Sequence, residues 1–161
     1  RRVLFRSVET RVGFGDFLPG VFGSTDLLGR QGSRAVVLDW KFGDGVLVDA
    51  VENDQLMFYA AAAMRTDAAK WIFEGVDEIE LIIVQPPQIR RWTTTKARII
   101  SFEQDLAKAV KRAQQDNAPI QTGEHCRWCA AKPICPQMNG AVERAVHQQI
   151  VNLDKIGRAH V

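Results

Sequence analysis

Apolar and polar positions divide the chain into segments that alternate like strands or repeat like helices. Val8–Phe14 and Gly20–Leu28 are predicted as two short strands around a turn rich in glycine and proline. Ala35–Phe42 is an apolar, β-branched run, which is typical of a strand buried on both faces. A glycine-rich turn follows at residues 43–45, and Val46–Ala50 is predicted as a short strand extension.

The next apolar segments predict one helix and one strand. Asn53 suits a helix N-cap, and the Ala/Leu/Met-rich segment after it predicts a helix as far as about Phe73. Glu80–Gln85 predicts another buried strand, which ends where Pro86 and Pro87 interrupt the pattern.

The remaining part of the chain predicts two further helices. Ser101, with Gln104 as its capping-box partner, is predicted to begin a helix that ends near Asp116. A cysteine-bearing loop follows, and then a helix over residues 141–153. The predicted order β-β-β-α-β-α is that of a single α/β domain, with a mixed central sheet flanked by helices.

Composition limits the classes of protein to which the chain can belong. The 161 residues are 46% hydrophobic and 25% charged, with a formal net charge of +2, which neither requires nor excludes a nucleic-acid partner. The longest apolar stretch, Leu56–Met64, is too short for a membrane helix, which needs about 20 residues. Three clustered cysteines do not resemble a secreted disulfide framework, so a reducing cytoplasmic location is expected.

The two ends are predicted to be foreign to the natural chain. A DNA string that encodes the last six residues, 156–161, also encodes residues 2–6 when its reverse complement is read. We therefore interpret residues 1–7 and 156–161 as adapter-derived and 8–155 as the natural domain, truncated at its N-terminus.

Candidate chemistry lies in Asp26, Asp39 and Lys41. Asp39 and Lys41 are two residues apart on a strand, so both side chains leave the same face. An acid and a base in so apolar a run are costly to bury unless they are paired or bound to a metal. Asp26 on the preceding strand can approach Asp39 if the two strands form a hairpin. The simpler alternative is that Asp39 and Lys41 form only a structural ion pair.

Paired carboxylates indicate Mg²⁺ or Mn²⁺, because hard divalent cations take oxygen ligands. An ion held by Asp26, Asp39 and the Trp40 carbonyl would polarise a phosphodiester and lower the pKa of a bound water. Lys41 would then orient or deprotonate that water and stabilise the charge growing at phosphorus.

Gln55 and Tyr59 follow on the predicted helix. They are four residues apart and share one helix face, so they could contact a DNA backbone together. Taken alone, they would more often be ordinary surface residues of a helix.

In this order, Gly23-x-x-Asp26, Asp39-x-Lys41 and Gln55-x-x-x-Tyr59 resemble the RecB-like branch of the PD-(D/E)XK nucleases. The segments 39–46, 53–59 and 82–87 are especially similar to phage-encoded exonuclease-like members, and the resemblance extends over about Val8–Pro136.

The resemblance implies a restriction-endonuclease-like core. It also implies Asp26 and Asp39 as metal ligands, Lys41 as catalytic base or charge stabiliser, and Gln55 and Tyr59 as DNA-positioning residues. Relatives carry an acidic residue on a helix before the first strand. This sequence has no such helix, so activity of the chain by itself depends on what precedes it.

Cys126-x2-Cys129-x5-Cys135 forms a second candidate site, since clustered thiols in a cytosolic protein indicate a metal centre. Zn²⁺ would need a fourth ligand, for which adjacent His125 is poorly placed and His147 is a candidate. The cysteine spacing also resembles RecB-like nucleases with a [4Fe–4S] cluster, in which a fourth cysteine lies far upstream. The resemblance favours that cluster, with a structural role.

Arg90 and Arg91, near Trp92 and Lys96, are candidate phosphate or base contacts, and the alternative is a solvated loop with a packed tryptophan. The sequence therefore predicts a Mg²⁺-dependent deoxyribonuclease that acts at DNA ends, with DNA as its partner. The resemblance alone implies a role in phage or prophage recombination or repair, with phage recombination proteins as further partners. Three alternatives remain: an endonuclease of the same fold, a nuclease-inactive DNA-binding module, and a zinc-stabilised interaction domain.

Overall fold

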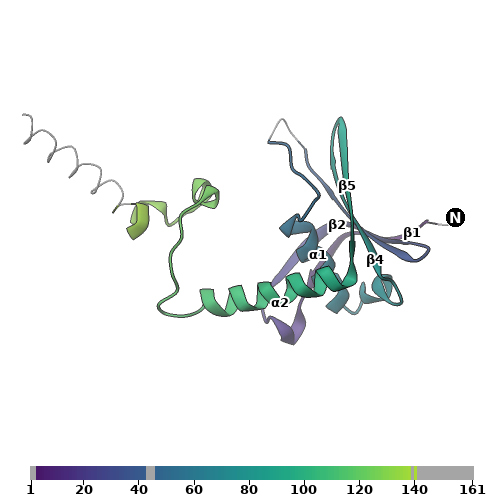
Figure 1. The fold of residues 1–161 in the computed structure, drawn as a ribbon, viewed down its shortest axis with the longest axis horizontal. Helices are drawn as coiled ribbons and strands as arrows, with labels where there is room; N and C mark the ends of the chain where they lie inside the picture. The colour runs from purple at the N-terminus through teal and green to yellow at the C-terminus, as the bar shows by residue number, and fades with distance from the viewer. Residues whose placement is uncertain (1–2, 43–45, 139, 141–161) are drawn as a thin grey trace, which may run out of the picture. The chain divides into compact units, whose positions relative to one another are not determined.

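A computed structural model describes residues 3–42, 46–138 and 140 (Figure 1). The chain divides into two compact units, Arg1–Arg112 and Ala113–Val161. The sheet and the candidate catalytic residues belong to the first unit. No helix among the residues that the structure describes is long and apolar enough to cross a membrane.

The first unit is an α/β structure built on one five-stranded mixed sheet in the order β1-β2-β3-β4-β5. β3 and β4 are parallel and all other neighbours are antiparallel. The strands span Val3–Gly13 (β1), Phe22–Gln31 (β2), Arg34–Trp40 (β3), Glu78–Gln85 (β4) and Gln88–Thr95 (β5).

Helix α1, Asp54–Arg65, connects the parallel strands β3 and β4, as parallel pairing requires a crossover. The Asn53 side chain accepts a hydrogen bond from the backbone N–H of Leu56 at 3.1 Å, which confirms the predicted N-cap. Ala60–Ala63 are fully buried, so the small side chains let the helix lie close to the sheet. The helix ends at Arg65, and the 3₁₀ turn Lys70–Phe73 follows, so the predicted helix was too long.

The main hydrophobic core lies between α1 and the sheet. It includes Leu28, Val37, Leu81 and Ile83 from three strands. A smaller cluster of Val36, Ile82 and Val84 occupies the other sheet face. Side chains of β3 and β4 are therefore buried on both faces, as their continuous apolar runs predicted.

Strand β5 corrects the sequence analysis, which ended the strand at Pro86-Pro87 and left residues 88–100 without structure. The prolines instead occupy the turn of an antiparallel hairpin, with Gln85 paired to Gln88. The β-branched run Thr93–Thr95 was the available signal. The observed order is therefore β-β-β-α-β-β-α.

Helix α2 spans Lys96–Ala113, so the predicted start at Ser101 was wrong. Ser101 is exposed within the helix, and Ile99, one turn before Glu103, is fully buried. Glu103 accepts hydrogen bonds from the Arg65 guanidinium, which ties α2 to α1 and raises the pKa of Arg65 above its usual value. Residues 46–50 form no strand, and the helix predicted over residues 141–153 lies outside the described residues.

Replacement of Leu81 by alanine should lower the free energy of unfolding by about 2–5 kcal/mol, because it opens a cavity under α1. Ile89→Ala on the neighbouring strand is the control, since Ile89 is exposed and the change should cost no more than about 0.5 kcal/mol. Urea denaturation of the two variants measures both effects. Equal losses would show that the core lies elsewhere.

Candidate functional site

Asp39 is the centre of the candidate site. It lies near the end of β3, opposite Ile83 of the parallel strand β4, and is only 4% exposed. Its neighbours on the same face belong to the hydrophobic core, as Val37 illustrates. A carboxylate in such surroundings loses most of its hydration and needs charged or hydrogen-bonding partners.

Lys41 supplies one partner, two residues along the chain. Its ammonium Nζ lies 2.8 Å from Asp39 Oδ2 and donates a hydrogen bond to Gln55 Oε1 at 2.7 Å. The backbone N–H of Lys41 donates to the Val84 carbonyl at 2.9 Å, which continues the strand pairing just beyond β3. The prediction that Asp39 and Lys41 leave one face of the strand is therefore consistent with their contact.

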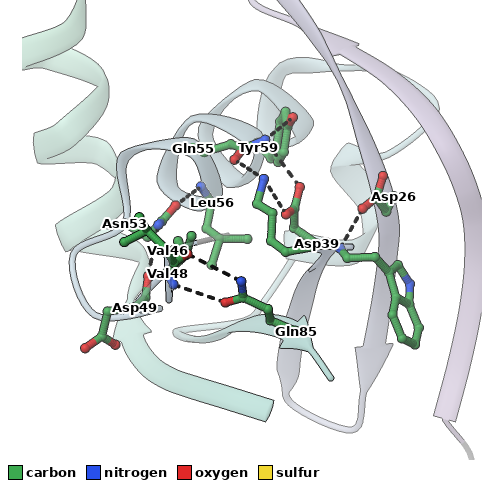
Figure 2. Close-up of polar contacts among 12 residues, drawn as sticks. Asp26, Asp39, Val46, Val48, Asp49, Asn53, Gln55, Leu56, Tyr59 and Gln85 are labelled. Atoms are coloured by element: carbon green, nitrogen blue, oxygen red, sulfur yellow. Dashed lines mark hydrogen bonds and ion pairs between the residues drawn. The ribbon is translucent and has the colours of Figure 1, made fainter. Parts of the chain in front are cut away.

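Gln55 joins three groups from the first turn of α1, as Figure 2 shows. Its amide nitrogen donates to Asp39 Oδ1 at 3.3 Å and to the Tyr59 hydroxyl at 2.8 Å. The opposite amide orientation would set its NH₂ group against the Lys41 ammonium, donor against donor. The four side chains thus form one network, and the helical i,i+4 spacing of Gln55 and Tyr59 builds part of it.

Asp26 reaches the same region from β2. In the β2–β3 hairpin, the pair farthest from the turn is Leu27 with Leu38. One step further along the two strands, the facing positions are those of Asp26 and Asp39. Its Oδ2 accepts a hydrogen bond from the Trp40 backbone N–H at 2.7 Å. In the view of Figure 2, Asp39 lies between Gln55 and Asp26. The predicted hairpin is confirmed, and the hydrogen bond of Asp26 is made with the Trp40 backbone rather than with the Asp39 side chain.

Two buried side-chain oxygens have no hydrogen bond among the residues described: Asp39 Oδ2 and Thr25 Oγ1. The contact of Oδ2 with the Lys41 ammonium is an ion pair that lacks hydrogen-bond geometry. A buried carboxylate oxygen with spare acceptor capacity beside a second carboxylate is the donor set that Mg²⁺ or Mn²⁺ prefers. The residues present therefore fit such an ion.

Gln85 supports the site from the end of β4, and sequence analysis missed it. Its side chain is buried, accepts from the Val48 N–H at 3.2 Å and donates to the Val46 carbonyl. These bonds fix the segment that leads from the candidate catalytic residues into α1. A polar residue closing the apolar run Leu81–Val84 was the available signal.

A groove beside the network was also missed. It has a volume of about 660 Å³ and shares Gln55 and Tyr59 with the site. Its other walls come from the start of β2 and from α2. The helix predicted from Ser101 already contained the lining residues Phe102, Leu106 and Ala109, but the sequence does not show where that helix face docks.

Arg90 and Arg91 lie on β5 rather than in a loop, and successive strand residues point to opposite faces. Arg90 donates to the Val48 carbonyl at 3.0 Å. Arg91 pairs with Glu80 at 3.1 Å, and Glu80 also pairs with Arg34 on β3. The two arginines therefore do not form one basic patch, and their DNA contacts stay a prediction. Trp92 packs against the main core.

Cys126, Cys129 and Cys135 lie in the second unit, on two short 3₁₀ turns and at their ends. All three are free thiols, and Cys129 is exposed. Within the described part of the chain, no three His, Cys, Asp or Glu side chains are grouped closely enough to hold a metal. The zinc and iron–sulfur centres stay predictions, and His147 lies outside the described residues.

Comparison with known proteins assigns a family. A family model described as "Protein of unknown function (DUF2800)" matches residues 4–158, so the chain belongs to this family. A crystal structure of a protein designated SSO0001 is similar over 82% of this chain, with 18% identity and a TM-score of 0.40. The matched region spans 60% of that protein.

A double-mutant cycle with Gln55→Ala and Tyr59→Phe should give a coupling free energy of about 0.5–1.5 kcal/mol, because each change removes the same hydrogen bond. Chemical denaturation of the single and double variants measures it. Pairing Tyr59→Phe with Gln104→Ala, at an exposed position on α2, is the control and should show no coupling. Coupling of equal size in both cycles would contradict the network.

Proposed function

We propose that this member of the DUF2800 family is a metal-dependent nuclease that hydrolyses DNA phosphodiesters, with a restriction-endonuclease-like core of the PD-(D/E)XK type. One observation carries the proposal. Asp39 is buried, keeps one oxygen without a hydrogen bond, and is joined to Lys41, Gln55 and Tyr59 in a single network. A structural ion pair alone would explain the contact between Lys41 and Asp39 Oδ2, but not the second carboxylate, Asp26, at the neighbouring position of the β2–β3 hairpin.

Asp39 and Asp26 would hold the ion, together with the Trp40 carbonyl. Mg²⁺ or Mn²⁺, when bound, polarises a phosphodiester and lowers the pKa of a bound water. The protein itself holds the two carboxylates in place. The hydrogen bond from Trp40 N–H holds the Asp26 carboxylate at the end of β3, and core packing holds the Asp39 backbone.

Lys41 would orient the attacking water and stabilise the negative charge that grows on the phosphate oxygens. Its ammonium now has two partners, Asp39 Oδ2 and Gln55 Oε1. When a substrate phosphate binds, a phosphate oxygen would replace one of these two partners. The positive charge of the Lys41 ammonium would therefore keep an acceptor at every stage.

Gln55 and Tyr59 would position the DNA backbone, Tyr59 by donating its phenol O–H to a phosphate. A Gln55 amide N–H would reach a phosphate by leaving Tyr59 or Asp39, its two present acceptors. Both donors come from α1, a helix fixed by its buried alanine face, so their spacing is set before substrate binds. Action at DNA ends, within phage recombination or repair, follows from the sequence resemblance. Comparing linear with closed circular DNA of the same sequence separates an exonuclease from an endonuclease.

Asp39→Asn should reduce Mg²⁺-dependent cleavage of linear DNA at least about 100-fold, because the substitution removes a charged ligand while keeping its shape. Asp77→Asn is the matched control at an exposed position and should leave cleavage unchanged. Mn²⁺ titration provides a second readout, in which only the Asp39 variant should lose affinity. Retained cleavage by Asp39→Asn would refute the proposal.

The cysteine segment is proposed to bind a structural [4Fe–4S] cluster, with Zn²⁺ as the alternative. Metal analysis of anaerobically purified protein distinguishes them, and an iron–sulfur cluster also gives visible absorbance that a reductant bleaches. Replacing Cys129 by serine should lower the metal content severalfold, whereas Ser33→Ala in the β2–β3 turn should leave it unchanged. A colourless protein with no bound metal would refute both centres.

A further inference from the structure

The groove beside the candidate site has a predominantly apolar wall. Its volume, about 660 Å³, lies within the range of about 300–1,000 Å³ that small-molecule sites occupy. The apolar residues that line it come from β2, α1 and α2: Phe22, Phe58, Tyr59, Phe102, Leu106 and Ala109.

The groove is continuous with the proposed phosphate site, because Gln55 and Tyr59 belong to both. Gly23 closes one wall. A Cβ there would lie 3.0 Å from Tyr59 Cε1 and 3.1 Å from Phe58 Cε1, so the two rings rest directly on the β2 backbone. The ring planes of Phe58 and Tyr59 are inclined at 75°, which leaves aromatic surface in two directions.

Charge in the groove limits what can enter it. Asp54 and Asp105 line the groove, and no basic residue is among its described lining. Asp105 pairs with Lys108 at 2.9 Å, which compensates part of its charge. The acidic lining still favours a neutral group with hydrogen-bond donors over a phosphate. A nucleobase suits both the aromatic walls and the acidic lining. Its flat faces can stack on the rings, and its amino groups can donate hydrogen bonds to a carboxylate.

We propose that the groove binds one unpaired nucleobase next to the scissile phosphate and prefers bases that carry an exocyclic amino group. This inference rests on the proposed nuclease function and names the part of the substrate that the neighbouring surface recognises. Adenine, cytosine and guanine carry such a group and thymine does not. A paired base stays stacked in the duplex and cannot lay its faces against the aromatic walls of the groove, so the recognised base must be unpaired.

Binding of short single-stranded oligonucleotides tests the preference. Fluorescence anisotropy in the presence of a chelator makes the measurement independent of cleavage. Oligo-dC and oligo-dA should bind about fivefold or more tightly than oligo-dT of the same length, as a gained amino–carboxylate contact requires. Equal affinity for the three would overturn the inference.

Ala109→Trp places a large side chain in the groove from an exposed position on α2. It should abolish the preference for dC and dA over dT. Ala97→Trp is the matched control, also exposed on α2 but outside the lining, and should keep the preference. If Ala109→Trp keeps it too, the groove serves another occupant, such as a basic peptide, and the inference fails.

The double variant D54N/D105N separates recognition of the base amino group from non-specific affinity for single-stranded DNA. Its binding of oligo-dT should stay the same or strengthen, because repulsion of the backbone falls. Its preference for oligo-dC should decrease severalfold. A uniform loss of affinity for every oligonucleotide would contradict the assigned role of the two aspartates.

Photocrosslinking locates the base directly. An oligonucleotide ending in 5-iododeoxycytidine should crosslink to Phe58, Tyr59 or Phe102, as peptide mapping would reveal. Trp40 and Phe42 stack on each other at 6.2 Å as a second exposed aromatic pair, and crosslinks there would overturn the inference. Failure of the nuclease proposal shows separately, as cleavage that survives Asp39→Asn.

Discussion

The carboxylate of Asp39 lies inside an apolar sheet, and its charge has to be compensated there. Lys41 supplies the opposite charge from the same strand, while Gln55 supplies a hydrogen bond from α1. Because Lys41 follows in sequence and Gln55 comes from a separate helix, Asp39 has both its ion pair and its side-chain hydrogen bond only when α1 is docked against β3. The same interaction that makes burial of Asp39 tolerable therefore assembles the candidate site.

Docking of α1 depends on small side chains. Ala60–Ala63 are fully buried against the sheet, and the absence of a side chain at Gly23 lets the rings of Phe58 and Tyr59 rest on β2. This close approach brings the first turn of α1 over the end of β3, where Gln55 meets Asp39. It also leaves the groove between α1 and α2 open, since the tie between these helices is the Arg65–Glu103 ion pair near the other end of α1.

Periodicity predicted the α/β class, the first four strands, the mixed sheet and the Asn53 cap. It failed where local signals conflicted with tertiary pairing. Pro86 and Pro87 end a strand in sequence terms, but the chain turns back at them because β4 offers an open edge to β5. α2 begins at Lys96 rather than at Ser101, since Ile99 is buried in the core and Ser101 faces solvent.

By itself, the sequence determined that Asp39 and Lys41 share a strand face and that Gln55 and Tyr59 share a helix face, because both relations are local and follow from backbone periods of two and 3.6 residues. Only the tertiary structure decided that these faces meet. The role of Gln85 and the groove belong to that second kind of information, as does the pairing of residues 88–95 with β4, which places Arg90 and Arg91 on a strand. Burial and pairing depend on residues distant in the chain, and no local pattern records which distant residues come together.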